Sequence, residues 1–249
     1  MQSDQTITSG VKFRQVAKAG SYGLYKIKLR ALLEFADALG VPKGYSAQLP
    51  PVGMGSITLV DQVILILLVK ILNPDTIVEI GTFKGFSTRL FLDNTNKTKV
   101  FTVDLPAEDV ENLDFGNEDL ARLSDTYNDN YLRLKQLEEG RVHLLNISPE
   151  QKNRLEMVEG DSTKLDFKAQ FRSADMVFID GGHDLRTIAS DTVNAEEVVK
   201  RGVVVWHDFG TSLHTDVNLF VQDYSKKHQI FHVENSLIAF TFLGLDSFF

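Results

Sequence analysis

The pattern of apolar and polar positions divides most of the chain into short apolar runs and segments with helical spacing. From residue 58 onward the two kinds of segment alternate, and the apolar positions of the longer ones recur every three or four residues. This alternation predicts a mostly parallel β-sheet covered by helices on both faces. The predicted strands are 76–80, 100–103, 155–158, 176–179 and 203–206, and the predicted helices include 59–72, 86–92 and 215–227.

Two apolar runs near the C-terminus predict a different strand pair. The runs 230–233 and 237–242 are separated by Glu-Asn-Ser at 234–236. A short polar connection of this kind joins two strands as a hairpin, so one strand is expected to be antiparallel. The expected fold class is therefore α/β, Rossmann-like, with a mostly parallel sheet and a C-terminal antiparallel strand.

Residues 1–55 predict an N-terminal helical extension, or cap, that forms one compact unit with a domain over 56–249. Residues 26–39 have apolar side chains at helical spacing, and Gly40 then ends that helix. The segment 49–55 contains two prolines and two glycines and is predicted to be a linker. The tyrosines within 21–25 are expected to line a substrate pocket or to form a subunit contact, two roles that the sequence does not separate.

Composition and charge exclude several classes of partner and site. The chain of 249 residues has no cysteine, which rules out disulfides and thiolate metal sites. No apolar stretch is long enough to span a bilayer, and the N-terminus does not resemble a secretory signal, so a cytoplasmic protein without a membrane partner is expected. We also expect a homo-oligomer.

The net charge of −8 is concentrated in one segment. Residues 105–139 contain ten acidic and three basic side chains, a balance of −7. Such a segment disfavours nucleic acid as a partner. Its helical part is either a solvated amphipathic helix or, as we expect, a cover over a bound cofactor, since it follows the end of the strand at 100–103.

The first glycine turn distinguishes between classes of nucleotide pocket. Gly81 and Gly85 follow the strand at 76–80 with the spacing G-x-x-x-G, which differs from the dinucleotide pattern G-x-G-x-x-G. Phe83 and Lys84 occupy positions where a pyrophosphate would need close backbone approach. The spacing therefore disfavours an NAD site.

Three acidic side chains surround this turn at predicted strand ends. Glu79 lies near the end of its strand, Asp104 closes the next strand, and Asp161 follows the strand at 155–158. In this topology the acid after the second strand binds ribose hydroxyls. Three acids at a glycine turn suit a ligand with a ribose and an amine but no phosphate, and S-adenosylmethionine is such a ligand.

A second polar group is expected at the same edge of the sheet. The motif Phe-Ile-Asp-Gly-Gly-His-Asp-Leu at 178–185 ends a predicted strand with Asp180 and His183, and Val-Val-Val-Trp-His-Asp at 203–208 ends the following one with Asp208. Because a parallel sheet delivers its strand ends to one edge, these side chains are predicted to share one site.

Taken in order, these motifs resemble the class I S-adenosylmethionine-dependent methyltransferases over residues 58–242. Within that family the chain resembles bacterial cation-dependent sugar and macrolide O-methyltransferases and, more distantly, catechol O-methyltransferase. The motifs that carry the resemblance are Val-Glu-Ile-Gly-Thr-Phe-Lys-Gly at 78–85, Thr-Val-Asp-Leu-Pro at 102–106, Glu-Gly-Asp-Ser at 159–162, and the acid and histidine segments at 176–183 and 204–210.

The resemblance implies a Rossmann-like methyltransferase fold, S-adenosylmethionine as cofactor, Mg²⁺ or another divalent cation, and a small-molecule hydroxyl as acceptor. It implies Asp180, His207 and Asp208 as metal ligands, with Asp180 also facing the methionine end of the cofactor. His183 occupies the place of the lysine base of catechol O-methyltransferase. The implied cofactor-binding residues are Glu79, Gly81, Thr82, Phe83, Ser87, Asp104, Asp161, Ser162 and Asp180.

The pair His207 and Asp208 departs from the family pattern, which has two acids or Asp-Asn here. Because of this difference, the sequence does not decide whether the site binds a metal. Methyl transfer needs aligned atoms and removal of a hydroxyl proton. A cation on Asp180 and Asp208 or the imidazole of His183 could each assist, and we expect the two to act together.

Several alternatives are left open by the sequence. Asp180 is either a ligand or the N-cap of a helix that begins near 185, and His183 is either a base or a surface histidine. His207 is a ligand, a buried core histidine or a residue that orients Asp208. The rival functions are a nicotinamide-dependent oxidoreductase, a catalytically silent cofactor-binding protein and, more remotely, a metal-dependent hydrolase.

Overall fold

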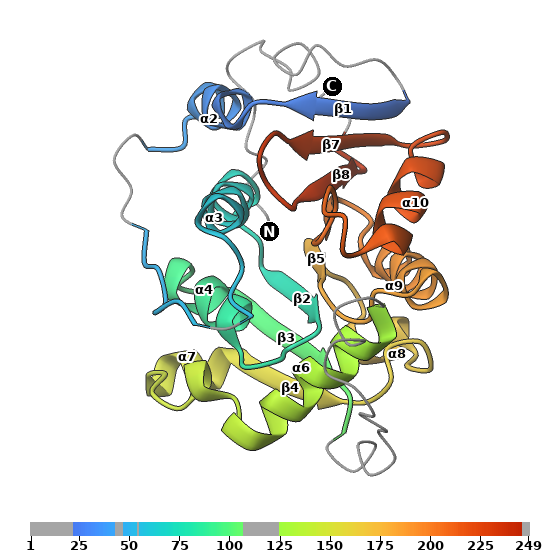
Figure 1. Cartoon of the computed structure of the whole chain (residues 1–249). Coiled ribbons are helices and arrows are strands. Elements are labelled where there is room, and N and C mark those ends of the chain that lie inside the picture. Colours follow the sequence, from blue (N-terminus) through green and yellow to red (C-terminus); the bar gives the residue numbers. More distant parts are fainter. Residues whose placement is uncertain (1–21, 43–46, 54, 107–124, 246–249) are drawn as a thin grey trace.

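The computed structural model describes residues 22–42, 47–53, 55–106 and 125–245. One eight-stranded sheet crosses the molecule, with helices on both of its sides (Figure 1). The strands are β1 Gly23–Ile27, β2 Thr76–Ile80, β3 Lys99–Asp104, β4 Leu155–Glu159, β5 Met176–Ile179, β6 Gly202–Trp206, β7 Gln229–Val233 and β8 Ala239–Leu243. The helices are α2 Leu29–Ala38, α3 Leu59–Leu72, α4 Phe86–Asn94, α6 Asp125–Glu139, α7 Pro149–Arg154, α8 Phe167–Phe171, α9 Leu185–Val198 and α10 Thr215–Tyr224, with a 3₁₀ turn at Val142–Leu144.

The strand order is β1-β7-β8-β6-β5-β2-β3-β4. Neighbouring strands are parallel, except that β8 runs antiparallel to both β6 and β7. The predicted α/β class, with a mostly parallel Rossmann-like sheet and an antiparallel strand near the C-terminus, is therefore confirmed. The predicted strands from β2 to β8 all form, with ends that differ by at most two residues.

Alternating side chains of the strands form two apolar cores, one on each face of the sheet. Ile77 and Phe178 point into the core that α2, α3 and α4 cover. Val78, Val177 and Trp206 point into the opposite core, which α8, α9 and α10 cover. Because strand side chains alternate between faces, neighbours such as Ile77 and Val78 serve different cores. The sheet is thus buried on both sides, which fixes the position of its strand ends.

The N-terminal extension is not purely helical as predicted. Residues Gly23–Ile27 form β1, which pairs in parallel with β7 and makes an edge of the sheet. The helix that follows begins at Leu29, where the prediction had it begin at residue 26. Tyr25 packs on the core beside Phe231, with ring centroids 6.2 Å apart. The tyrosines of this segment therefore lie at the sheet edge formed by β1, and none of the described ones lines the cavity described below.

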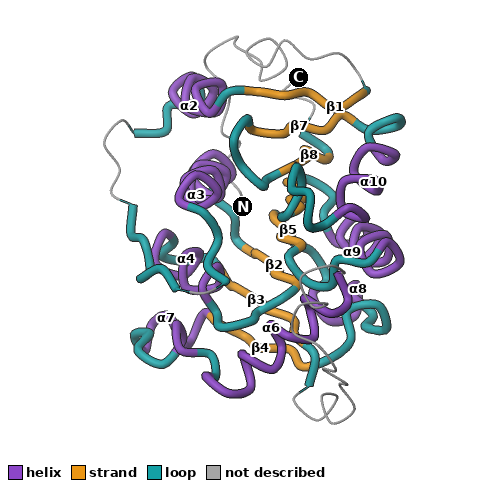
Figure 2. The backbone as a smooth tube through the Cα atoms, in the orientation of Figure 1, coloured by secondary structure: helices purple, strands orange, loops and turns teal. Residues whose placement is uncertain are grey.

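The chain reverses direction across the sheet between β2 and β5. From β2 it continues to β3 and β4 on one side, whereas β5, β6 and β8 lie on the other. In open α/β sheets, ligands bind outside the carboxyl ends of the strands at such a switch point. Figure 2 shows the connections that leave β2 and β5 as loops. A ligand site is therefore expected beside the residues that follow Ile80 and Ile179.

Part of the acidic segment lies outside the described residues. This part is 107–124, and the helix of the segment is described as α6, Asp125–Glu139. No helix in the described ranges combines the length and the apolar character that crossing a membrane requires.

Candidate active site

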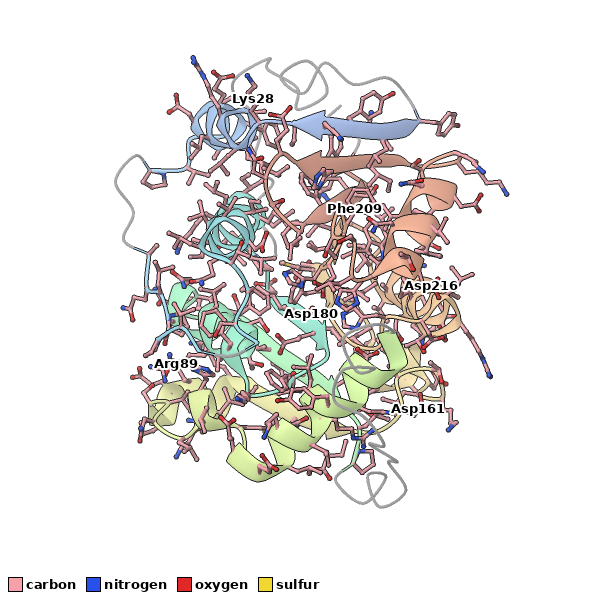
Figure 3. The ribbon with its side chains drawn as sticks, in the orientation of Figure 1. Lys28, Arg89, Asp161, Asp180, Phe209 and Asp216 are labelled. Atoms are coloured by element: carbon pink, nitrogen blue, oxygen red, sulfur yellow. The ribbon has the colours of Figure 1, made fainter. Side chains whose placement is uncertain are left out.

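A cavity of about 730 Å³ opens at the carboxyl edge of the sheet, at the switch point. It brings together most of the residues that the sequence predicted for the site. Figure 3 labels Asp180, near the middle of the molecule, and Asp161, closer to the outer strand β4. The predicted residues that line the cavity are Gly81, Phe83, Asp104, Asp161, Ser162, Asp180, His183, His207 and Asp208.

Gly81 joins the two loops at the switch point. Its φ is +96°, and a Cβ at this position would lie 2.0 Å from the backbone oxygen of Asp180. The Gly81 N–H donates to Val103 O at 2.9 Å, and the Asp180 N–H donates to Ile80 O at 2.8 Å. Only glycine fits this conformation and this approach, because any side chain would push the loop after β5 away. The two loops therefore hold the wall of the cavity in place together.

Phe83 forms another part of the cavity wall. Its φ of +45° is unusual for a residue with a side chain. The ring lies against the backbone of Gly55, where an added Cβ would come within 2.2 Å of Phe83 Cε1. Lys84, which was predicted to crowd a phosphate, is buried and pairs with Glu139 at 2.6 Å. The turn thus connects the linker before α3 to the end of α6.

Asp104, the predicted ribose ligand, lies under helix α6. Its Oδ2 accepts hydrogen bonds from Gln136 at 2.6 Å and from Arg141 at 3.4 Å. Burial raises the pKa of Asp104 and outweighs the opposing effects of Gln136 and Arg141. Asp129, Leu132, Arg133 and Gln136 of α6 line the cavity. Helix α6 therefore lines the cavity beside Asp104.

Asp161 and Ser162 line the cavity on the β4 side. The Asp161 Oδ1 accepts hydrogen bonds from the backbone N–H and the hydroxyl of Thr163, at 3.0 and 2.6 Å. Lys164 Nζ lies 2.7 Å from its Oδ2. Burial alone would raise the pKa of Asp161, but Lys164 and Thr163 lower it. The carboxylate is thus ionised and fixed at the cavity rim.

Three predicted cofactor-binding residues do not line the cavity: Glu79, Thr82 and Ser87 are buried behind the glycine turn. Glu79 Oε2 accepts hydrogen bonds from the hydroxyls of Thr88 and Thr102. Complete burial raises the pKa of Glu79 to about 7. Glu79 is one residue short of the strand end, so its side chain points to the face of the sheet and not beyond its edge. These side chains support the turn and do not reach the cavity.

Asp180, His207 and Asp208 converge at the inner end of the cavity. The Nδ1 atom of His207 lies 3.0 Å from Asp180 Oδ1 and 3.1 Å from Asp208 Oδ2. One donor atom from each residue lies within 4.8 Å of the others, as a shared cation requires. Asp208 has a left-handed backbone with φ of +58°, which turns its side chain back toward the cavity immediately after β6.

His183 lies between two carboxylates. Its Nδ1 is 2.5 Å from Asp129 Oδ1, and its Nε2 is 2.9 Å from Asp208 Oδ2. Burial alone would lower the pKa of His183, but the hydrogen bonds and charges of Asp129 and Asp208 raise it well above the usual value. In this arrangement the ring is a cation that donates from both nitrogens. It accepts a proton only once one of the carboxylates is neutralised.

Burial alone would likewise lower the pKa of His207, which the charges and hydrogen bonds of Asp180 and Asp208 raise well above the usual value. Conversely, burial would raise the pKa of Asp208, and His207 and His183 lower it well below its usual range. Imidazolium and carboxylate groups of opposite charge are therefore in direct contact in this cluster. Positive charge at this point stabilises the carboxylates, whether it comes from imidazolium or from a cation.

The structure decides two of the alternatives that the sequence left open, namely whether Asp180 is an N-cap and whether His207 is a core histidine. The N-cap of α9 is Asp184, whose side chain accepts from the N–H groups of Arg186 and Thr187. Asp180 therefore does not cap that helix. His207 is buried yet faces the cavity, in contrast to His232, whose Nδ1 lies 3.0 Å from Ile238 O in the core.

Three residues of this cluster were not predicted from the sequence. Asp61 lies on α3 with its Oδ2 3.5 Å from His207 Nε2, and Asp129 reaches His183 from α6. His214, at the start of α10, stacks on His183 with ring centroids 3.9 Å apart. No spacing relates these positions to the strand-end motifs, so only the packing of their helices reveals them.

The comparison with curated proteins found no match for this chain. Solved structures with a similar arrangement include a protein of Staphylococcus aureus named after the caffeoyl-CoA O-methyltransferases, with 16% identity and a TM-score of 0.49 over 88% of this chain and 93% of that one. Another is an O-methyltransferase from Bacillus cereus in complex with SAH, with 16% identity and a TM-score of 0.45 over 86% and 90% of the two chains. These likenesses concern the fold.

The sequence profile of the methyltransferase domain matches residues 78–209, which is more than half of the chain. The match begins immediately before Glu79 and ends immediately after Asp208, so it contains both the glycine turn and the acid and histidine motifs. It confirms the resemblance that those motifs carry. The chain belongs to the methyltransferase domain family.

Proposed function

We propose that this protein transfers the methyl group of S-adenosylmethionine to a hydroxyl of a small molecule, such as a sugar or a natural-product intermediate. The observation that carries the proposal is that one cavity joins the glycine turn at Gly81 to the cluster of Asp180, His183 and Asp208. Its volume of about 730 Å³ lies in the range of small-molecule sites. Six aspartates line it together with two arginines, one lysine and three histidines, and Asp104 and Asp161 on the β3–β4 side suit a cationic sulfonium better than a phosphate.

The donor would lie along the ends of β2, β3 and β4. Asp104 would accept hydrogen bonds from the ribose hydroxyls, with Gln136 beside it on α6. Ser162 and Asp161 would lie at the adenine edge, and the backbone at Gly81 would face the methionine end together with Asp180. This order follows the strand order and would put the methyl group next to the histidine cluster.

In the reaction, an oxygen lone pair of the acceptor attacks the methyl carbon while the carbon–sulfur bond breaks, and the products are a methyl ether and S-adenosylhomocysteine. The hydroxyl proton would go to Nε2 of His183. Asp129 holds Nδ1 of the same ring at 2.5 Å, so that Nε2 points toward Asp208 and the cavity.

Asp180, His207 and Asp208 fit a divalent cation, because an imidazole nitrogen and two carboxylate oxygens converge there within 4.8 Å. When bound, such a cation supplies positive charge that orients a hydroxyl and lowers its pKa. With Asp208 engaged in this way, the attraction that keeps His183 protonated is reduced. His183 Nε2 is then able to act as the base.

The test begins with calorimetry of the full chain against S-adenosylhomocysteine and against NADH. We expect binding of the former only, since the glycine spacing disfavours a dinucleotide. Methyl transfer from labelled S-adenosylmethionine is then measured with a panel of sugars and hydroxylated aromatic compounds. Binding of NADH without S-adenosylhomocysteine would favour an oxidoreductase, and a tight S-adenosylhomocysteine complex without any acceptor would favour a silent binding protein.

The acceptor found in that panel allows the role of His183 to be tested. We expect His183→Ala to lower kcat by about 100-fold or more, as removal of a general base does. His228→Ala is the matched control, because His228 stacks on Tyr224 and does not line the cavity. Equal kcat values for the two variants would contradict the assignment of the base.

A further inference from the structure

We infer that the centre formed by Asp180, His207 and Asp208 binds a first-row transition-metal dication in preference to Mg²⁺. The inference rests on the cation site of the proposed function and goes beyond it, since it names the class of ion from the donor atoms. Four features of the described residues support it: the donor set, the residue behind His207, the histidines on the far side of Asp208, and the charge around His207.

The donor set is mixed. It consists of one imidazole nitrogen, His207 Nδ1, with carboxylate oxygens of Asp180 and Asp208 at 3.0 and 3.1 Å. Neighbouring ligands of an ion with bonds of about 2.1 Å are about 3.0 Å apart at a right angle, so these separations need little rearrangement. Magnesium prefers an all-oxygen, water-rich octahedral shell, whereas imidazole suits manganese, iron, cobalt and zinc. The nitrogen therefore favours the second group.

Asp61 lies behind His207, on the side of the ring that faces away from the other two carboxylates. Its Oδ2 lies 3.5 Å from His207 Nε2, the ring nitrogen that points away from Asp180 and Asp208. Asp61 is fully buried and fixed on both oxygens, by the Thr58 hydroxyl at 2.6 Å and by the backbone N–H of Leu237 at 2.8 Å. Metal-bound histidines regularly donate their second N–H to such a carboxylate, which fixes the ring and increases its basicity.

Further imidazoles surround the outer side of Asp208. His183 Nε2 lies 2.9 Å from Asp208 Oδ2, and His214 Nε2 lies 3.9 Å from Asp208 Oδ1. Donor atoms of His183, Asp208 and His214 also lie within 4.8 Å of one another. Imidazole nitrogens thus lie on both sides of the Asp208 carboxylate. Nothing comparable would stabilise magnesium, which binds nitrogen poorly.

Charge around His207 also favours a dication. Asp61, Asp180 and Asp208 are all within 3.5 Å of this single ring. Within the described ranges, each ion pair that these three carboxylates make is with a histidine. Together with Asp129, these carboxylates carry four negative charges, which exceeds the two positive charges that His183 and His207 can carry. A bound dication would offset this excess.

The primary experiment needs no variant. The full chain is stripped of metal, and Mn²⁺, Co²⁺ and Mg²⁺ are titrated separately by calorimetry at one pH and ionic strength. We expect Mn²⁺ and Co²⁺ to bind at least about tenfold more tightly than Mg²⁺. The Co²⁺ complex should also show a visible absorption band with nitrogen coordination. Magnesium binding that equals or exceeds that of Mn²⁺ would overturn the inference.

Two variants connect the preference to the proposed donors. His207→Asp would make all three donor atoms oxygen and should shift the Mn²⁺/Mg²⁺ affinity ratio toward magnesium by at least about tenfold. Asp61→Asn should weaken Mn²⁺ binding by about 10- to 100-fold, as loss of an outer partner does. His228→Asn is the control, because it removes a histidine remote from the cavity and should leave both affinities unchanged. An unchanged ratio in a folded His207→Asp variant would exclude His207 as the determinant.

The outcomes separate this inference from the proposed function. Binding of S-adenosylhomocysteine together with magnesium preference overturns the ion assignment and leaves the methyltransferase proposal standing. Binding of S-adenosylhomocysteine without any of the three ions overturns the cation site altogether. Tight transition-metal binding by a protein that does not bind S-adenosylhomocysteine supports the ion assignment and contradicts the methyl donor, in favour of metal-dependent chemistry such as hydrolysis.

Discussion

Asp129 Oδ1 lies 2.5 Å from His183 Nδ1, and Asp129 Oδ2 accepts the backbone N–H of His183 at 3.1 Å. A single carboxylate on α6 thus fixes both the ring and the backbone of a residue in the loop after β5. Because α6 also reaches Asp104 through Gln136, the same helix connects the predicted donor end of the cavity with the acceptor end. Asp129 is therefore a positioning residue for His183.

We expect Asp129→Asn to lower kcat by about 10- to 100-fold, because His183 loses the partner that orients it as a base. The pKa of His183 is raised by Asp129, so it should fall in the variant. The acid limb of the pH–rate profile should therefore move to lower pH while the maximal rate drops. Lys135→Gln on the same helix is the control, since Lys135 pairs with Glu138 away from the cavity. An unshifted profile would exclude this role.

Asp104→Asn should weaken binding of S-adenosylhomocysteine by about 10- to 100-fold, which corresponds to loss of a hydrogen bond to a charged acceptor. Glu159→Gln is the control: Glu159 pairs with Asp104 in the β3–β4 register but is mostly exposed and does not line the cavity. Calorimetry measures both variants. If the two affinities were equal, Asp104 would not be the ribose ligand.

Gly81→Ala should destabilise the fold by about 3 kcal/mol or more, because the new Cβ would collide with the Asp180 backbone in addition to its left-handed strain. Gly40→Ala provides the comparison: its φ is +76°, but no atom lies within 4 Å of the added Cβ. That variant should cost only about 1 kcal/mol, the strain alone. Urea unfolding of both variants measures the difference, and similar values would show that the loop after β5 yields easily.

Asp191→Asn should change how stability depends on pH. Burial raises the pKa of Asp191 from 3.8 to about 7, and the charges of Asp161 and Asp184 add to this effect. The folded state therefore holds this proton more tightly than the unfolded chain, and its contribution, complete below pH 3.8, is lost as pH rises to about 7. We expect the stability of the variant relative to wild type to increase between pH 5 and 8, by at most about 3 kcal/mol.

The control for this pH series is Glu197→Gln, which alters an exposed acid on the same helix α9. It should follow the wild-type curve at every pH. Chemical unfolding at closely spaced pH values provides the measurement. A constant difference between Asp191→Asn and wild type across the range would mean that Asp191 ionises normally in the folded protein.

The N-terminal strand shows where prediction from the sequence ended. The segment Gly23–Ile27 is short, and only its pairing with Gln229–Val233, some two hundred residues away, makes it a strand. The helix predicted from residue 26 does form, but it begins three residues later because the strand continues to Ile27. Local pattern predicts an element well when its own periodicity is strong, and poorly when a distant partner decides it.

Glu79 and Asp104 show the same limit within the site. Both acids lie near the end of a predicted strand, and the sequence assigns both to the ligand. The structure turns Glu79 into the core beside Thr88 and Thr102 and leaves Asp104 at the cavity. In the β2–β3 register Glu79 pairs with Thr102, so Asp104 lies on the same face of the sheet but two positions nearer its carboxyl edge. Which acid reaches the cavity therefore depends on the register of the two strands, which the sequence does not give.

The sequence by itself determined the alternation of strands and helices, the glycine turn, and the acids and histidines at the ends of β5 and β6, because each of these depends on neighbours along the chain. The tertiary structure decided which helices close the site. Asp61 from α3, Asp129 from α6 and His214 from α10 meet His207 and His183 only through packing against the sheet. Contacts between such distant segments depend on the apolar surface that both cores bury in the folded protein, and the spacing of residues along the chain does not predict it.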